Sequence, residues 1–364
     1  MDFIPQIQPW IDDSELEELR KVISSTYISE NDATKEFEEM LRKITGAKYA
    51  IAYANGTLGL AASLMVLGIG PGDEVIVPDL TFIATANAVI LAGATPVICD
   101  INESGWQISP ASLRSKISSK TKAIIPVHLY GQSAEMDEIM AIAKEHKIYI
   151  IEDAAESIGT TYKNKHVGTI GDIGMISFYA NKIVTSAEGA VMLTEDENLA
   201  KELYKMKNHG REKKGIFIHE SIGFNFSFSD LHAAVGISQL KKLPKILARK
   251  EEINNKYLAE LKNTVKFYQN PDHISPVYWF TNIEVPSAEK LEIFLKENGI
   301  GSRRFFYPLH LQPCYQSPKA NIVLGDFPNS LNAYETGLSL PSSYSLTNEQ
   351  QDYVILKIKE FFKV

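Results

Sequence analysis

Hydrophobic and polar residues recur with two periods along the chain, and these periods distinguish predicted helices from predicted strands. Asp12, Asp13 and Ser14 can cap a helix whose apolar residues recur at helical spacing, and a second helix of the same kind follows. A polar turn at Asn55-Gly56-Thr57 then separates the apolar run Tyr49–Tyr53 from a helix of small residues between Leu58 and about Leu67. The apolar positions of the first two helices are Leu16, Leu19, Val22 and Ile23, and then Phe37, Met40, Leu41 and Ile44.

Short apolar runs, most of them separated by helical stretches, continue this pattern through the next part of the chain. Runs of this length are typical of buried strands. An alternation of strands and helices predicts an α/β fold in which helices cover a mostly parallel sheet. The predicted strands are Glu74–Val77, Thr95–Cys99, Ala123–Val127, Ile148–Ile151 and Met175–Phe178.

The pattern changes near Leu240, where a long charged stretch with one apolar face begins. Lys241 to Lys262 reads as a single helix that links the first region to a smaller α/β region. We therefore predict a large domain over residues 1–240, and a linker helix with a small C-terminal domain over residues 241–364. The elements expected in the small domain are a strand within Trp279–Val285, a helix at Ala288–Asn298 and a closing helix at Asn348–Phe362.

Composition and charge exclude several classes of protein. The net charge of −8 over 364 residues, without a basic block containing aromatics, gives no reason to expect a nucleic-acid partner. Met1 precedes Asp2 directly and no basic segment leads into an apolar core, so we expect no secretory signal. No apolar run reaches the length of a membrane helix, so we expect no membrane span. The two cysteines, Cys99 and Cys314, lie far apart without metal-ligand spacing. This usage favours a reducing compartment, the cytoplasm, and no metal site.

Lys182 and Asp153 are the residues with the most informative chemistry. Asp153 ends an apolar run, where open α/β sheets place residues that contact ligands, and Lys182 lies in a polar turn between two apolar segments. Such a pair can hold pyridoxal phosphate (PLP): the lysine amine bonds to the cofactor aldehyde, and the carboxylate keeps the pyridine nitrogen protonated. The alternatives are a solvated surface lysine and an aspartate that caps the next helix.

Four segments in matching order resemble the DegT/DnrJ/EryC1/StrS family of PLP-dependent aminotransferases, and the likeness covers nearly the whole chain. The resemblance implies the fold of aspartate aminotransferase (fold type I). The chain looks most similar to the perosamine-synthase branch, which aminates a GDP-linked 4-keto-6-deoxyhexose using L-glutamate. The four segments are Gly70–Pro78, Pro126–Gln132, Ile151–Glu156 and Ser177–Lys182.

The residues also predict where the rest of the cofactor would bind. A strand that runs into a turn and then a helix leaves free amides at Asn55-Gly56-Thr57, which suit a phosphate, although an ordinary N-cap has the same sequence. By resemblance, Ser177 donates to the same phosphate and Phe82 stacks on the pyridine ring. Glu156, three residues after Asp153 and roughly on the same helical face, matches the position that contacts the phenolic oxygen, where many members have glutamine.

Resemblance further implies a homodimer with shared active sites, in which Asn225 reaches the phosphate held by the neighbouring subunit. Many members carry an arginine where Ser227 stands, which leaves the binding of an anionic substrate group open. The turn Ala187–Ala190 and the loop Ser29–Ala33 also contain fewer glycines than the family pattern. The expected substrate contacts are Arg303, Tyr307 and His310, with Tyr315 nearby; a solvated arginine and a packed core histidine are the alternatives.

Three functions remain open at this point. The first is a transamination that carries an amino group from L-glutamate to a nucleotide-linked 4-keto-6-deoxy sugar, for a surface polysaccharide such as a capsule. In this reaction Lys182 moves a proton in both halves. The second retains this chemistry on a small phosphorylated ketone such as dihydroxyacetone phosphate. The third is a non-catalytic regulatory relative, which we would expect to lack Lys182 or Asp153.

Overall fold

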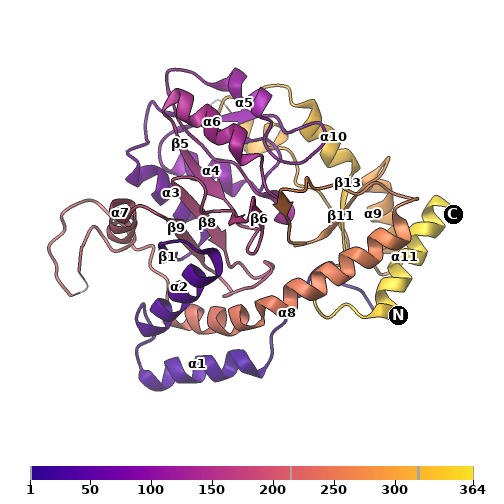
Figure 1. Ribbon diagram of the computed structural model, residues 1–364, viewed down its shortest axis with the longest axis horizontal. Coiled ribbons are helices and arrows are strands. Elements are labelled where there is room, and N and C mark those ends of the chain that lie inside the picture. The colour runs from indigo at the N-terminus through magenta and orange to yellow at the C-terminus, as the bar shows by residue number, and fades with distance from the viewer. Residues whose placement is uncertain (1, 214, 318–319, 364) are drawn as a thin grey trace.

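The computed structural model describes residues 2–213, 215–317 and 320–363, and a seven-stranded sheet lies at its centre (Figure 1). The strands of this sheet are β1 (Tyr49–Tyr53), β2 (Glu74–Pro78), β3 (Thr95–Cys99), β4 (Thr121–Ile124), β5 (Tyr149–Asp153), β8 (Ile173–Ser177) and β9 (Ala190–Thr194). Their order is β1-β9-β8-β5-β4-β2-β3. The strands from β3 to β8 in this order are parallel, and only β9 and β1, at one edge, pair antiparallel. The predicted mostly parallel sheet is therefore confirmed.

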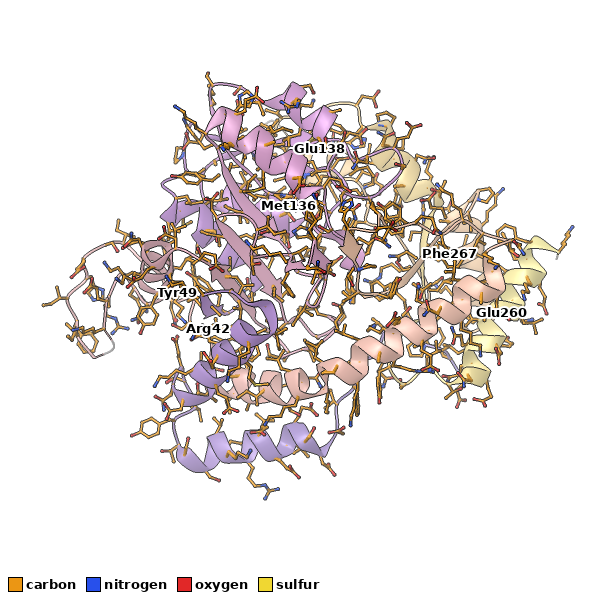
Figure 2. All side chains as sticks on the ribbon, viewed as in Figure 1. Arg42, Tyr49, Met136, Glu138, Glu260 and Phe267 are labelled. Carbon is orange, nitrogen blue, oxygen red and sulfur yellow. The ribbon has the colours of Figure 1, made fainter. Side chains whose placement is uncertain are left out.

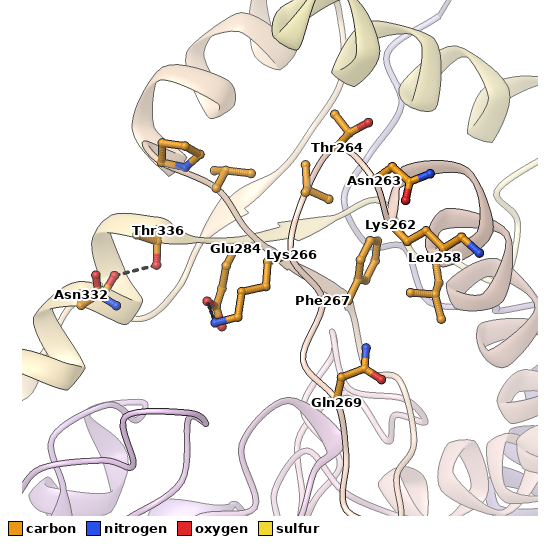
Figure 3. Close-up of a pocket in the computed structure, with 13 residues that line it drawn as sticks. Leu258, Lys262, Asn263, Thr264, Lys266, Phe267, Gln269, Glu284, Asn332 and Thr336 are labelled. Atoms are coloured by element: carbon orange, nitrogen blue, oxygen red, sulfur yellow. Dashed lines mark hydrogen bonds and ion pairs between the residues drawn. The ribbon is translucent and has the colours of Figure 1, made fainter. Parts of the chain in front are cut away.

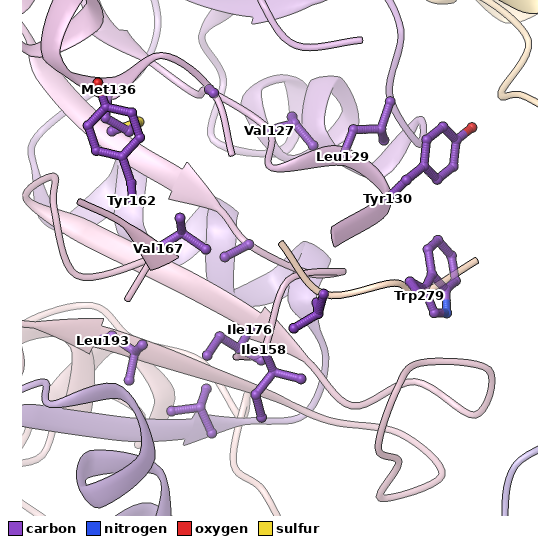
Figure 4. Packing of buried hydrophobic residues seen from close by; sticks show 14 of the residues in the cluster. Val127, Leu129, Tyr130, Met136, Ile158, Tyr162, Val167, Ile176, Leu193 and Trp279 are labelled. Atoms are coloured by element: carbon purple, nitrogen blue, oxygen red, sulfur yellow. The ribbon is translucent and has the colours of Figure 1, made fainter. Parts of the chain in front are cut away.

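Helices cover both faces of this sheet because its buried side chains alternate between two cores. In β2, Val75 and Val77 belong to the core beneath α3 and α4, whereas Ile76 belongs to the opposite core with residues of α2 and α6. Figure 4 shows part of this second core, and Figure 2 shows side chains filling the space between the layers. The helices of this part are α1 (Asp13–Ser25), α2 (Asp32–Thr45), α3 (Gly56–Val66), α4 (Ala84–Leu91), α5 (Pro110–Lys116), α6 (Met136–His146), α7 (Glu197–Lys207) and the short η1 (Leu129–Gly131).

The C-terminal region has its own small sheet and its own apolar core. Three antiparallel strands in the order β11-β13-β12 pack with α9, α11 and the end of a long preceding helix around residues such as Ile283 and Leu291. The elements of this region are β11 (Thr281–Glu284), α9 (Ala288–Glu297), β12 (Arg303–Arg304), η2 (Leu309–Leu311), η3 (Pro313–Tyr315), α10 (Pro328–Thr336), β13 (Gly337–Leu340) and α11 (Asn348–Phe362). A further small sheet joins β6 (Thr161–Tyr162), β7 (Lys165–His166) and β10 (Ile274–Ser275). The predicted helices at 288–298 and 348–362 are confirmed.

One long helix, α8 (Asp230–Leu261), runs from beneath the large sheet to the C-terminal region (Figure 1). It begins 11 residues before the predicted Lys241 (241 minus 230), so the predicted division at 240–241 falls inside it. The early start has two causes, one local and one from a distant part of the chain. The Ser229 hydroxyl caps the helix, and the Asp230 carboxylate accepts hydrogen bonds from the amides of Asn31, Ala33 and Thr34 at 2.7–3.1 Å. These contacts fix the start of α8 against the start of α2.

The N-terminal tail packs on the C-terminal region. The Ile4 amide donates to the Gly299 carbonyl at 2.9 Å, and the Gly301 amide donates to the Ile4 carbonyl at 2.7 Å. The two chain ends therefore lie on the same side of the molecule (Figure 1). No helix in the described part of the chain is long and apolar enough to span a bilayer.

Some predicted elements differ from the structure. The strand expected at Ala123–Val127 ends at Ile124, because Pro126 has no amide to continue the ladder. In α1, Val22 is buried but Leu16 and Ile23 are exposed, so the repeating apolar positions do not form one buried face. Instead α1 packs on α8 through Glu15, a buried carboxylate that accepts hydrogen bonds from Lys242 at 2.8 Å.

Candidate active site

A cavity of about 680 Å³ opens at the carboxyl ends of β5 and β8, beside the first turn of α3. Strand ends and a helix start meet there because parallel strands followed by helices place all their carboxyl ends on one edge of the sheet. Nine of the residues predicted from the sequence line this cavity: Asn55, Gly56, Thr57, Phe82, Asp153, Glu156, Ser177, Lys182 and Arg303.

Asp153 is the last residue of β5, and its carboxylate is held from two sides. The Thr85 hydroxyl donates to Oδ2 at 2.9 Å, and the Ala155 amide donates to Oδ1 at 3.2 Å. Burial raises the pKa of Asp153 above its ordinary value, although the Thr85 hydrogen bond opposes the change. No helix follows Asp153, so the helix-cap alternative is wrong. No basic side chain in the described part of the chain forms an ion pair with this carboxylate, and the Lys182 charge attracts it only from a greater distance.

Lys182 lies within the cavity rather than on the open surface, and its side chain is only 13% exposed. Its Nζ is 3.2 Å from Glu156 Oε1 and 4.1 Å from the centre of the Trp279 ring. The Trp279 indole is itself fixed, because its Nε1 donates to the Asn181 carbonyl at 2.8 Å. The solvated-lysine alternative is therefore wrong: neighbouring side chains hold this amine in one place.

Glu156 is held between Lys182 and the backbone of η1. The Tyr130 amide donates to Glu156 Oε2 at 2.8 Å, with Tyr130 in the left-handed region at a φ of 57°. Burial raises the pKa of Glu156, and the Lys182 charge partly opposes this. Glu156 stands in a turn after β5 and not on a helical face, so that detail of the prediction is wrong. Tyr130 and Trp279 lie near each other at the edge of the core (Figure 4).

The first turn of α3 forms a cradle for an anion. The Asn55 side chain accepts from the Leu58 amide at 3.0 Å, which leaves the amides of Gly56 and Thr57 without a backbone partner. A Cβ on Gly56 would approach the Met175 sulfur to 3.0 Å, so the glycine keeps this wall of the cavity open. The end of the helix dipole and two free amides suit a phosphate dianion.

These residues fit PLP. The amides of Gly56 and Thr57 would hold the phosphate with the Ser177 hydroxyl. Asp153 would pair with the protonated ring nitrogen, which would give the buried carboxylate the positive partner that it lacks. The Lys182 amine is positioned to bond to the aldehyde.

Four residues of the predicted site lie outside this cavity. The Asn225 backbone pairs with that of Asn208, and the Tyr307 ring packs against Tyr334. The His310 ring binds the buried Asp79 carboxylate, with Nδ1 2.6 Å from Oδ2. The Tyr315 hydroxyl donates to the Asn87 side chain at 2.7 Å. His310 and Tyr315 therefore make structural contacts that connect the C-terminal region to β2 and α4.

The segments with fewer glycines than the family pattern also have internal partners. Glu30, in the loop Ser29–Ala33, lies 2.9 Å from the fully buried amine of Lys207. The Ser227 hydroxyl donates to the Lys207 carbonyl at 3.2 Å, so it occupies the place of an arginine without adding a charge. Glu188 and Gly189, from the turn Ala187–Ala190, line the cavity.

Several residues that shape the site carry no specific signal in the sequence. Thr81 and Thr85 stand behind Asp153, with their hydroxyls 3.1 Å apart. Trp279 and Phe306 come from the C-terminal region and form a wall of the cavity. A hydroxyl in the first turn of a helix and aromatic rings in loops have no pattern that separates them from ordinary core residues.

Lys250 of α8 supports this wall from behind. Its amine is buried and donates to the carbonyls of Trp279 and Ser342, each at 2.9 Å. Burial lowers the pKa of the Lys250 ammonium to about 7. These partners are carbonyl groups, and neither carries a negative charge that would stabilise the ammonium. On folding near neutral pH, the amine must therefore either lose its proton or remain charged without water around it.

We expect the stability advantage of the natural protein over Lys250→Met to grow as the pH rises from 7 to 10. The unfolded lysine titrates near 10.5, so between pH 7 and 10 the unfolded chain binds more protons than the folded chain. The free energy of unfolding of the natural protein therefore rises with pH in this window. The gain is on the order of a few kcal/mol at most. Urea unfolding of both proteins across this range would measure it. Parallel stability curves would contradict the low pKa.

A second hollow, of about 650 Å³, lies in the C-terminal region between the end of α8 and α10 (Figure 3). Its lysines, Lys262 and Lys266, are exposed, and Lys266 pairs with the half-buried Glu284 at 2.6 Å. This hollow therefore differs from the Lys182 cavity, where two of the lining acids are buried.

Comparison with known proteins agrees with the geometry of that cavity. The DegT/DnrJ/EryC1/StrS aminotransferase family matches residues 9–359. The chain is 36% identical to GDP-perosamine synthase of Escherichia coli, over 100% of this chain and 99% of the relative. It is also 36% identical to the spore coat polysaccharide biosynthesis protein SpsC of Bacillus subtilis, over 99% and 97%. A solved aminotransferase of this family from Brucella abortus superimposes with a TM-score of 0.91 at 33% identity, over 97% and 96% of the two chains.

Proposed function

Because the chain belongs to the DegT/DnrJ/EryC1/StrS aminotransferase family, a family of PLP-dependent enzymes, we propose that it aminates a nucleotide-linked sugar. The amino group comes from L-glutamate, and the acceptor is the keto group of a 4-keto-6-deoxy sugar used for a surface polysaccharide such as a capsule. The observation that carries this proposal is the convergence of Lys182, Asp153 and Glu156 on a single cavity beside a phosphate cradle. The names of the relatives, a GDP-perosamine synthase and a spore coat polysaccharide biosynthesis protein, support the acceptor class.

Each buried group has a separate task in this reaction. PLP, when bound, supplies a protonated ring that stabilises negative charge at the carbon bearing the amino group. Asp153, held by Thr85 and Ala155, keeps the proton on the ring nitrogen. Its buried position strengthens this pairing because there is little water to screen it.

Lys182 is the group that moves the proton. Its amine takes a proton from the α-carbon of glutamate and, in the second half of the reaction, delivers one to the keto carbon of the acceptor. Trp279 on one side and Glu156 on the other confine the amine to a small volume. Such confinement raises the effective concentration of the base at the reacting carbon.

Glu156 holds a proton near the phenolic oxygen of the cofactor. Its raised pKa favours a shared proton where many family members use the amide of glutamine. The Tyr130 amide fixes Oε2, which leaves Oε1 directed at Lys182. Glu156 therefore serves as a hydrogen-bond donor without adding a second full negative charge beside Asp153.

An acceptor panel tests the proposal. We expect glutamate-dependent formation of 2-oxoglutarate with a GDP-linked 4-keto-6-deoxyhexose, and at least about a hundredfold lower kcat/KM with dihydroxyacetone phosphate, which lacks the distant groups that supply binding energy. UDP- and dTDP-linked ketones show which nucleotide base the enzyme prefers. If dihydroxyacetone phosphate turns over faster than every nucleotide-linked ketone, the proposed sugar acceptor is wrong and the small phosphorylated ketone takes its place.

We propose that the enzyme is a cytoplasmic homodimer with shared active sites. The exposed large apolar side chains include two groups, Leu16 and Ile23 on α1, and Phe217, Ile218 and Ile222 between α7 and α8. Part of the latter segment projects from the body of the chain (Figure 1), as expected for an arm that covers a second copy. Asn225 lies in the same connection and outside its own cavity, which supports a contact with the partner's phosphate. The two free cysteines fit a reducing compartment.

A further inference from the structure

We propose that a second cleft, lined by carboxamides and aromatic rings behind Tyr130, is a binding site for an uncharged sugar ring. The cleft holds about 230 Å³ and lies between the large sheet, α8 and the C-terminal region. None of the residues that line it also lines the Lys182 cavity. We call it the amide pocket, after its five carboxamide side chains: Gln132, Asn254, Gln269, Asn270 and Asn282.

The amide pocket contains polar groups that the protein does not satisfy. Asn254 is only 7% exposed, yet its side chain forms no hydrogen bond within the described part of the chain. Asn282 uses its Oδ1 to accept from Ser339 at 2.6 Å, which leaves its NH₂ group available. Buried polar groups are almost always paired, so an unpaired Asn254 amide on the wall of a cavity indicates an occupant with both donors and acceptors.

The remaining walls favour a sugar ring over other polar occupants. Trp106, Tyr268, Tyr278 and Phe280 supply aromatic surfaces, and no charged side chain lines the pocket. Hydroxyl groups donate and accept, as carboxamides do, and the C–H faces of a pyranose pack against aromatic rings. A phosphate or carboxylate would need a cation, and an amine would need an acid. The volume suits one such ring, or roughly seven water molecules.

Tyr130 connects the amide pocket to the reaction. Its ring lines the pocket, whereas its amide holds Glu156 and its hydroxyl accepts from the Phe306 amide at 3.1 Å. A sugar in the pocket would therefore contact a residue that positions two walls of the Lys182 cavity. The site assignment itself does not depend on which ketone the enzyme aminates.

The test is to soak holoenzyme crystals in L-fucose and D-mannose at millimolar concentration and to titrate both sugars by calorimetry. We expect a ring in contact with Asn254 and Asn282, and binding weakened by about tenfold in Asn254→Leu through loss of its hydrogen bonds. Asn263→Leu, an equal change at an exposed position in the groove of Figure 3, should bind like the natural protein.

Asn254→Leu breaks no hydrogen bond within the described part of the protein, so it should melt at or above the temperature of the natural protein. If it fails to fold, Gln132→Met tests the same pocket from its opposite side. Water alone in the soaked pocket, sugar only in the Lys182 cavity, or equal binding by Asn254→Leu and the natural protein would each overturn the assignment.

Discussion

Lys182→Ala should abolish transamination, with a fall in kcat of about 10⁴-fold or more, because the same amine anchors the cofactor and moves the proton in both half-reactions. The proposed cofactor contacts at Gly56, Thr57 and Asp153 do not involve this amine, so PLP should still bind. Turnover of glutamate with the nucleotide-linked ketone measures the effect, and dialysis followed by cofactor assay measures binding.

Lys182→Arg is the matched control for this change. It retains a positive charge beside Glu156 and Trp279 but cannot act as a free base, since guanidinium keeps its proton. We expect it to be as inactive as Lys182→Ala while melting closer to the natural protein. Activity within tenfold of the natural protein in either variant would refute the role assigned to Lys182.

A mixture of Lys182→Ala and Asn225→Ala chains should regain activity if each site is built from two subunits, when the assay contains too little PLP to load Asn225→Ala alone. Asn225→Ala should bind PLP about 10–100-fold more weakly, because it removes a hydrogen bond to a charged phosphate. In a heterodimer with Lys182→Ala, one of the two sites contains both natural residues. Complete exchange at equal concentrations should restore about a quarter of natural activity, since half of the dimers are mixed and half of their sites are intact.

The control for this experiment is the Asn225→Ala protein alone, taken through the same exchange procedure. Its subunits exchange, but no dimer gains an intact site. Sedimentation under assay conditions shows whether dimers are present. Full activity of Asn225→Ala alone, or no recovery in a mixture that sedimentation shows to be dimeric, would contradict the shared site. A monomer that retains PLP and full activity would exclude it.

Local sequence predicted those parts of the fold that depend on neighbouring residues. Strand β3 and helix α11 have the predicted limits, because each is bounded by its own turn and capping residues: the Thr347 side chain caps α11 in a reciprocal pair with Gln350. The start of α8 was missed, because it depends on contacts between Asp230 and a loop about 200 residues earlier in the chain. No window of sequence contains both partners.

The site shows the same difference between features set by neighbouring residues and features set by distant contacts. Asp153 and Lys182 stand at strand ends and turns, where the pattern itself suggests ligand contact. Trp279 and Lys250 act through the packing of the C-terminal region against α8. Neither an aromatic residue in a bend nor a charged residue on a helix indicates this packing in the sequence. His310 was predicted at the site from a motif, but the structure pairs it with Asp79 instead. Chemistry on one element is therefore more visible in sequence than chemistry shared between elements.

The most direct test of the account is to identify the lysine that carries the cofactor. The purified holoenzyme should be yellow, and borohydride should remove the colour by fixing the pyridoxyl group to the lysine bonded to it. Peptide mapping should then find this group on Lys182, between Asn181 and Ile183. A pyridoxyl group on any other lysine, or a protein that takes up no PLP, would contradict the account.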